Sequence, residues 1–85
     1  MYKISVKKSA LKELESIPKS DRSRIIAHID ALANNPRPQG VRKLENYESS
    51  YRIRIGNYRV IYSIEDEKLL IEVIKVADRK EAYKK

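Results

Sequence analysis

The stretch YRIRIGNYRVIYSI, residues 51–64, decides the fold, because it alternates like two β-strands around a tight turn. Tyrosine, isoleucine and valine occupy one set of alternate positions, and the other set includes Arg52, Arg54 and Arg59. A period of two places each set on one face of a strand. Gly56-Asn57 between the two runs suits a two-residue hairpin turn. The stretch therefore predicts a β-hairpin with one apolar face and one arginine-rich face.

The two-residue turn also fixes which residues of the hairpin face each other. Arg54 is expected opposite Arg59, and Arg52 opposite Ile61. Directly opposed like charges destabilise a sheet by roughly 0.2–1 kcal/mol. One interpretation is a solvated face on which arginine stems cover apolar sheet. The other, which we favour, is an anion site, since planar guanidinium groups match phosphate oxygens in a bidentate fashion.

The rest of the chain predicts an α+β domain with the element order β-α-α-β-β-β-β, a small twisted antiparallel sheet packed against an N-terminal α-helical hairpin. Strands are expected at residues 2–7, 41–46 and 68–76 in addition to the hairpin, with a loop at 36–40 and one helical turn in the tail. The first helix ends at Pro18, and Ser20 or Asp21 is expected to cap the second. The apolar stripes predicted for the two helices are Ala10, Leu11, Leu14 and Ile17, then Ile25, Ile26, Ile29, Leu32 and Ala33.

Length and composition favour a single domain spanning residues 1–85. The chain has no cysteine, no apolar run of membrane-spanning length and no signal-peptide pattern, so a cytoplasmic protein that does not enter a membrane is expected. The formal net charge is +7, which favours a polyanionic partner such as nucleic acid or an acidic protein.

The residues that could carry chemistry are few. Carboxylates and histidines do not cluster at metal-ligand spacing, no glycine-rich phosphate loop is present, and His28 is the only histidine. We therefore expect no metal and no cofactor. Arginine stays protonated and is a poor base, but it stabilises charge that develops on a phosphate. RNA supplies its own nucleophile, the 2′-hydroxyl, so cleavage chemistry with these residues points to RNA.

Three segments, NPRPQGVRKLEN, YRIRIGNYRVIY and VIKVADRKEAYK, resemble the RelE/ParE superfamily of bacterial and archaeal toxins from toxin–antitoxin pairs. The resemblance covers essentially the whole chain, and the middle segment is the most specific. It implies a twisted antiparallel sheet against a helical hairpin. Its RelE branch resembles ribosome-dependent messenger-RNA endonucleases, which cut codons in the ribosomal A site by metal-free 2′-hydroxyl attack.

The resemblance also implies roles for individual residues. The basic residues of the first hairpin strand fall on Arg52 and Arg54, and the transition-state arginine falls on Arg59. The late-strand arginine falls on Arg79, and the tail tyrosine that stacks on a base falls on Tyr83. Two further basic residues are expected to contact RNA, namely Arg42 and Lys43.

The implied partners are a cognate acidic antitoxin, in a toxin–antitoxin hetero-oligomer, together with the ribosome and messenger RNA. Operator DNA would be contacted only through the antitoxin. Two alternatives stay open. The ParE branch resembles DNA gyrase poisons, although it tends not to keep the basic cluster. A non-catalytic RNA- or antitoxin-binding relative is the other, because this chain has Asp78 where many relatives have histidine, and arginine at 52 and 54 where some have lysine.

Overall fold

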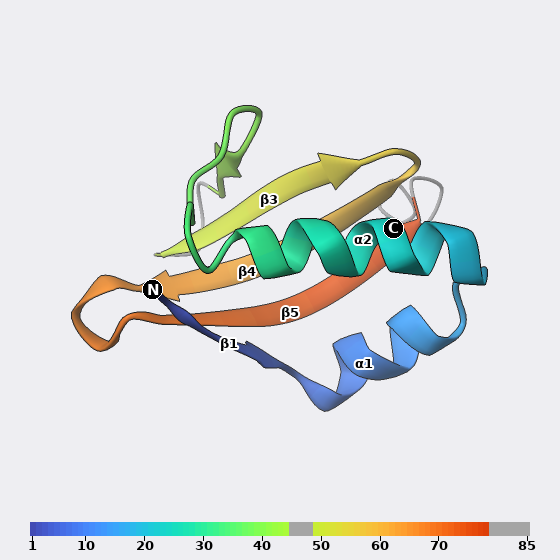
Figure 1. Cartoon of the computed structure of the whole chain (residues 1–85), viewed down its shortest axis with the longest axis horizontal. Coiled ribbons are helices and arrows are strands. Elements are labelled where there is room, and N and C mark those ends of the chain that lie inside the picture. Colours follow the sequence, from blue (N-terminus) through green and yellow to red (C-terminus); the bar gives the residue numbers. More distant parts are fainter. Residues whose placement is uncertain (45–48, 79–85) are drawn as a thin grey trace.

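The computed structural model describes residues 1–44 and 49–78, and it shows two layers, a five-stranded sheet with two helices on one of its faces (Figure 1). The order of elements and the α+β class agree with the prediction. No helix in the described ranges is long and apolar enough to cross a membrane. The elements in chain order are β1 (Lys3–Val6), α1 (Lys8–Glu15), α2 (Lys19–Ala31), β2 (Arg42–Lys43), β3 (Ser50–Ile55), β4 (Tyr58–Glu65), a short 3-10 helix (Asp66–Lys68) and β5 (Leu70–Asp78).

The strands are arranged in the order β1-β5-β4-β3-β2. The pairs from β2 to β5 are antiparallel, whereas β1 pairs with β5 in parallel, with Lys3 opposite Leu70. The described sheet is therefore mostly antiparallel, as predicted, and the pairing of β1 with β5 makes it mixed. A hairpin turn forces two strands to run in opposite directions, but β1 is joined to the rest of the sheet through the helices, so no turn sets its direction.

The core lies between the helices and the predicted apolar face of the hairpin. Val60 and Tyr62 are completely buried, and Ile55 is 3% exposed. Opposite them, the helical layer supplies buried side chains from both helices and from the residues that follow them, namely Ala10, Leu14, Ile17, Ile25, Ile29 and Leu32. The arginine-rich face of the hairpin is thereby turned away from the helices.

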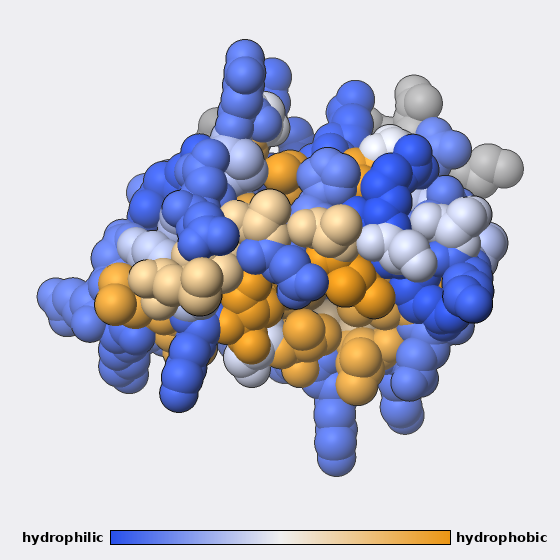
Figure 2. All heavy atoms as spheres, in the orientation of Figure 1, coloured by the Kyte–Doolittle hydropathy of each residue, from blue (hydrophilic) through white to orange (hydrophobic). Residues whose placement is uncertain are grey.

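Two of the side chains predicted for the helical stripes are not in the core. Leu11 is 48% exposed and Ile26 is 42% exposed. Each directly follows a fully buried residue, Ala10 or Ile25. Because neighbouring positions on a helix are about 100° apart, a helix that contacts the sheet along a narrow stripe buries one of the two side chains and exposes the next. Figure 2 shows hydrophobic side chains at the surface of this helix-bearing face.

The start of α2 also differs from the prediction. The helix begins at Lys19, directly after Pro18, and no side chain caps it. Ser20 and Asp21 therefore lie inside the first turn. The fixed φ of Pro18 orients the chain for the helix without a capping hydroxyl, and the Asp21 carboxylate near the N-terminus interacts favourably with the helix dipole.

A β-bulge interrupts the β4–β5 pairing between Ile61 and Tyr62. A bulge leaves a backbone group without its ladder partner. Close to the bulge, a side chain from α1 contacts β5: one carboxylate oxygen of Glu13 accepts a hydrogen bond of 2.9 Å from the Val76 backbone N–H, and the other accepts one of 3.0 Å from the Lys75 ammonium. The bond fixes the first helix against the last strand.

Candidate functional site

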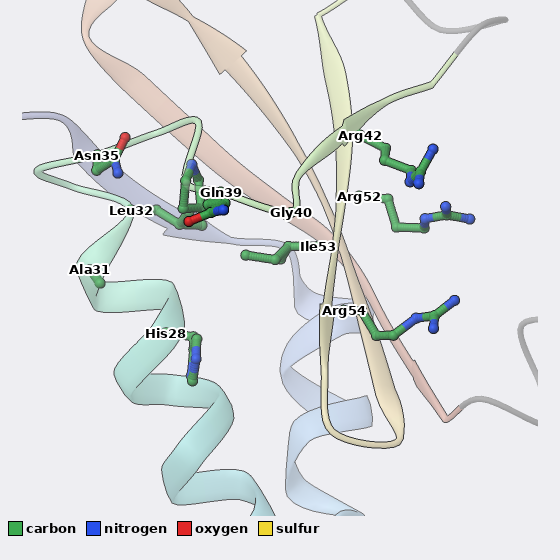
Figure 3. Close-up of a pocket in the computed structure, with 11 residues that line it drawn as sticks. His28, Ala31, Leu32, Asn35, Gln39, Gly40, Arg42, Arg52, Ile53 and Arg54 are labelled. Carbon is green, nitrogen blue, oxygen red and sulfur yellow. The ribbon is translucent and has the colours of Figure 1, made fainter.

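The hairpin register brings the arginines together as predicted. Arg54 lies opposite Arg59, and Arg52 lies opposite Ile61. On the other side of β3, Arg42 of β2 lies opposite Arg52. We call the surface formed by Arg42, Arg52, Arg54 and Arg59 the arginine face. Figure 3 shows the side chains of Arg42, Arg52 and Arg54 extending to the same side of β3, away from α2.

The four guanidinium groups differ in their exposure to solvent. Arg42 and Arg54 are exposed and Arg52 is half-buried, whereas Arg59 is only 7% exposed. On β5, the residue opposite Arg59 is Ala77, which is also buried. A guanidinium keeps its charge on burial, and an anion next to it is attracted more strongly than in bulk water. Sequence periodicity located Arg59 on this face but gave no sign that it is buried.

The other predicted site residues are placed differently or lie outside the described residues. Lys43 lies opposite Tyr51, whose ring belongs to the core side of the sheet. Because opposed residues share a face, Lys43 is turned away from the arginine face. Asp78 ends β5 opposite Tyr58. Arg79 and Tyr83 lie outside the residues that the structure describes.

A groove of about 520 Å³ lies beside the outer edge of β3. It exists because β2 covers only two positions of that edge, so β3 has no described strand partner there beyond Arg52. On the helix side its polar lining includes His28, Asn35 and Gln39, and on the strand side it reaches residues 52–54 (Figure 3). The groove thus joins the arginine face to the helical layer.

A second cluster of polar groups, which the sequence interpretation missed, surrounds Arg37. Its guanidinium donates to both carboxylate oxygens of Asp66, at 2.9 and 3.3 Å, and to the hydroxyl of Tyr51 at 3.2 Å. The Tyr2 hydroxyl donates to the same carboxylate at 2.6 Å. We call Arg37, Asp66, Tyr2 and Tyr51 the Arg37 network. It ties the loop after α2 to the turn before β5.

The Arg37 network changes the acidity of its members. Hydrogen bonds from Arg37 and then Tyr2 hold the pKa of Asp66 below its ordinary value. Donation to that carboxylate raises the pKa of Tyr2. An ionised carboxylate that accepts several hydrogen bonds is favoured over its protonated form, which would lose them. Asp66 is therefore an ionised acceptor for Arg37 at neutral pH.

Tyr62 extends this cluster into the core. Its ring stacks on that of Tyr51, with centroids 6.0 Å apart and an interplanar angle of 28°. Its hydroxyl donates a hydrogen bond of 2.7 Å to the Pro36 carbonyl. Burial raises the pKa of Tyr62 to about 12. The Tyr62 hydroxyl thus ties the start of the loop at Pro36, which leads to Arg42 and β2, to strand β4.

Groups suited to metal binding are dispersed over the described parts of the chain. Within residues 1–44 and 49–78, no three histidine or carboxylate side chains come close enough together to hold a metal ion. The arginine face and its rim instead offer hydrogen-bond donors and positive charge. Such a surface can bind an anion, orient it and stabilise additional negative charge on it.

Comparison with known proteins places this arrangement in a family. Residues 4–83 match the sequence profile described as "ParE toxin of type II toxin-antitoxin system, parDE". The chain belongs to the RelE/ParE family of toxins. RelE1 of Methanocaldococcus jannaschii is 30% identical over 98% of this chain and 96% of its own length.

Solved structures support the RelE side of the family. RelE in the RelE–RelB complex of Pyrococcus horikoshii superposes with a TM-score of 0.83 and 35% identity, covering 92% of this chain and 94% of that one. RelE in the intact Escherichia coli RelBE toxin–antitoxin complex gives a TM-score of 0.81 and 26% identity, covering 92% and 96%. The chain is therefore a RelE-type toxin in both sequence and fold.

Proposed function

We propose that this toxin is a ribosome-dependent messenger-RNA endonuclease that cuts codons in the ribosomal A site by metal-free attack of the RNA's own 2′-hydroxyl. The observation that carries the proposal is the arginine face, where Arg54 lies opposite Arg59 and Arg42 opposite Arg52. Repulsion between cross-strand neighbours of like charge disfavours folding, whereas a phosphate placed between them turns the same charges into attraction.

In this reaction the 2′-oxygen forms a bond to phosphorus and the bond from phosphorus to the 5′-oxygen breaks. The products are a 2′,3′-cyclic phosphate and a 5′-hydroxyl, and the proton lost by the 2′-hydroxyl is balanced by the one gained on the leaving oxygen. Arg59 stabilises the charge on the pentavalent phosphate, because its buried guanidinium is already in position. Arg52 and Arg54 orient the phosphate so that attack is in line.

Two further residues are assigned from the family resemblance alone. Arg79 is proposed to join the phosphate contacts, and Tyr83 to stack on the base next to the cut. An unperturbed tyrosine has a pKa of about 10 and is a weak base at neutral pH. Stacking is therefore the main role proposed for Tyr83, with proton transfer secondary.

The proposed regulatory partner is an acidic antitoxin. The relatives from Pyrococcus horikoshii and Escherichia coli were crystallised with RelB antitoxins. A chain with a formal charge of +7 attracts an acidic protein. Exposed Leu11 of α1 and Ile26 of α2 offer apolar contacts to such a partner. Operator DNA would be reached only through the antitoxin.

Primer extension on messenger RNA bound to ribosomes, with a known codon in the A site, tests the proposal directly. We expect cuts within that codon, and no cuts in the same RNA without ribosomes. Lys12→Ala is a suitable control, because it removes one exposed positive charge from α1, in the layer on the opposite side of the sheet. Intact RNA on programmed ribosomes, with a folded wild-type toxin, would refute the proposed activity.

A second candidate function is suggested by the family match, because the matching family is described as a ParE toxin. In this alternative the toxin would inhibit DNA gyrase without cutting RNA. A supercoiling assay with purified gyrase distinguishes the two activities. Inhibition of supercoiling combined with intact ribosome-bound RNA would favour the ParE-like function. Binding to programmed ribosomes with neither effect would indicate the non-catalytic relative.

A further inference from the structure

We propose that Glu13 of α1 is a positioning residue for RNA cleavage, because its carboxylate holds the backbone of β5 where this strand passes Arg59. The inference rests on the proposed function and adds to it a residue from the helical layer. Glu13 acts without touching RNA. It acts through β5, whose Ala77 lies opposite Arg59.

The carboxylate of Glu13 binds two consecutive residues of β5. One oxygen accepts a hydrogen bond of 2.9 Å from the backbone N–H of Val76, and the other accepts one of 3.0 Å from the Nζ of Lys75. The Glu13 side chain is 29% exposed, so part of it is shielded from water. A hydrogen bond to an ionised group is short and strong, and partial burial strengthens it. The β5 backbone is thus held at the residue directly before Ala77.

The two residues that this carboxylate binds follow the β-bulge directly, at the point where the register of β5 against β4 is set. Without the bulge, the register before it would continue and bring Val76 opposite Arg59. With the bulge, Val76 is buried in the core and Ala77 lies opposite Arg59. A shift by one residue moves each later side chain to the other face of the sheet. The end of β5 therefore determines what packs beside the buried arginine.

Glu13 contacts β5 beyond the reach of β1. The pairing of β1 with β5 runs only from Leu70 to Val73. In the described part of the chain, the sheet has no further strand on that side of β5. Backbone groups at the edge of a sheet bond to water or to side chains where no strand pairs with them. The Glu13 carboxylate thus supports the second half of β5, as β1 supports the first half.

The position of Glu13 within α1 does not favour the helix itself. The helix spans Lys8–Glu15, so Glu13 lies in its last turn. A negative charge in the last turn interacts unfavourably with the helix dipole, whereas a basic side chain such as Lys12 interacts favourably. Glu15 carries the same charge in the same turn but is exposed, so it provides a matched control. What sets the Glu13 carboxylate apart is its contact with β5.

A small displacement at the end of β5 has a large effect on the proposed chemistry. Arg59 is 7% exposed and has Ala77 as its neighbour on β5. Arg79, which we assign to the phosphate contacts, directly follows Asp78 in the sequence. A misplacement of about 1 Å near a reacting group costs up to about 100-fold in rate. Loss of the Glu13 contact should therefore slow cleavage and leave ribosome binding unchanged.

Three variants separate the backbone contact from the ion pair. Glu13→Ala removes both, Glu13→Gln keeps an oxygen that can accept from Val76, and Lys75→Ala removes only the ion pair. Single-turnover cleavage on programmed ribosomes, titrated with toxin, gives a maximal rate and a half-saturating concentration. We expect Glu13→Ala to lower the maximal rate by about 10- to 100-fold at an unchanged half-saturating concentration. Glu13→Gln and Lys75→Ala should stay within about 3-fold of wild type, and the control Glu15→Ala should equal it.

Amide hydrogen exchange measured by NMR reports the contact without any cleavage. The Val76 amide should exchange faster in Glu13→Ala than in wild type, and at the wild-type rate in Glu13→Gln and Glu15→Ala. Tyr62→Phe controls for general destabilisation, because it removes a buried hydrogen bond on β4 and should keep its cleavage rate per folded molecule. If Glu13→Ala does not fold, Glu13→Asp replaces it. Its shorter side chain cannot reach both partners, so an intermediate loss of maximal rate is expected.

Three results would overturn the positioning role while leaving the proposed function intact. One is a wild-type maximal rate in folded Glu13→Ala, and another is a loss in Glu13→Gln as large as in Glu13→Ala. The third is a change in the half-saturating concentration alone, which would make Glu13 a ribosome contact. A wild-type toxin that leaves ribosome-bound RNA intact would instead refute the proposed activity, and the positioning role would fall with it.

Discussion

Arg37 and the arginine face present the same side chain in opposite electrostatic settings. The donors of Arg37 reach both oxygens of Asp66 and the hydroxyl of Tyr51, all supplied by the fold. On the arginine face, the cross-strand neighbour of Arg54 is Arg59. Arg37 is thus matched to an acceptor from its own chain, whereas Arg54 and Arg59 are cross-strand neighbours of like charge.

The difference separates an arginine that ties two segments of the fold together from arginines that we propose bind RNA. Breaking the Arg37 network removes attractive contacts, so it should weaken the fold and leave chemistry alone. Removing an arginine from the arginine face leaves the apolar core cluster unchanged, so the protein should still fold but lose the proposed chemistry. Each of the following variants tests one side of this contrast.

Arg59→Ala should have the largest effect. We expect cleavage of ribosome-bound RNA to fall by at least about 100-fold, because removing one preorganised donor to a transition state has an effect of this size. The variant should stay folded, since Arg59 is not part of the apolar core cluster. Single-turnover cleavage on programmed ribosomes and circular dichroism measure the two quantities. Full activity in a folded Arg59→Ala protein would remove this residue from the site.

Tyr62→Phe tests the buried tyrosine that packs against the Arg37 network. We expect the free energy of unfolding to fall by about 0.5–1.5 kcal/mol, because the Pro36 carbonyl loses its hydrogen-bond donor. Cleavage per folded molecule should be unchanged. Urea unfolding of both proteins at neutral pH measures the difference, and an unchanged stability would show that water replaces the hydroxyl without loss.

The stability difference between wild type and Tyr62→Phe should also depend on pH. The pKa of Tyr62 is raised from 10.0 to about 12 in the folded protein. Its hydroxyl therefore contributes stability that is present below about pH 10 and is lost as pH rises toward about pH 12. The stability difference between wild type and Tyr62→Phe should shrink over that interval. A constant difference would contradict the role of burial.

Arg37→Ala should lower the melting temperature by only a few degrees, because the ion pair with Asp66 is half exposed and exposed pairs contribute little. Arg24→Ala, which breaks an exposed pair with Asp21 within α2, is the matched control and should cost less. Both variants should cut ribosome-bound RNA like wild type once corrected for folded protein. Loss of cleavage in a folded Arg37→Ala toxin would end the distinction between the two regions.

Asp66→Asn should give the smallest effect, and one that depends on pH. The folded-state pKa of Asp66 is lowered, so its contribution to stability is present above its ordinary value of 3.8 and is lost as pH falls through the folded pKa. The variant should melt slightly below wild type near neutral pH and together with it in strong acid. Thermal melts across that range decide, and a difference that grows in acid would be inconsistent with this role.

Local patterns in the sequence were sufficient to predict the hairpin and its register. Period-two alternation located both strands, and the Gly56 turn, with φ of 59°, fixed the pairing of Arg54 with Arg59. The predicted α+β class and element order are confirmed for the same reason, since each element carries its own periodicity. These features depend on residues that are neighbours in the chain.

The features that could not be predicted depend on residues far apart in the chain. The bond between Arg37 and Asp66 requires the loop after α2 to meet the turn before β5, which no spacing rule contains. The burial of Arg59 depends on its position between β3 and β5 in the finished sheet. The exposure of Leu11 depends on how the short helix α1 lies on the sheet. The catalytic and RNA-binding roles of the arginines stay predictions that the experiments above address.

The parallel pairing of the first strand with the last has a consequence for biosynthesis. Lys3 pairs with Leu70, so β1 has no sheet to join until β5 has left the ribosome that makes it. Chains emerge at roughly 5–20 residues per second, and contacts between distant segments form late because they close long loops. A nascent chain therefore exposes its arginine hairpin before the sheet is complete. We expect the sheet that carries the arginine face to be completed only after β5 has emerged.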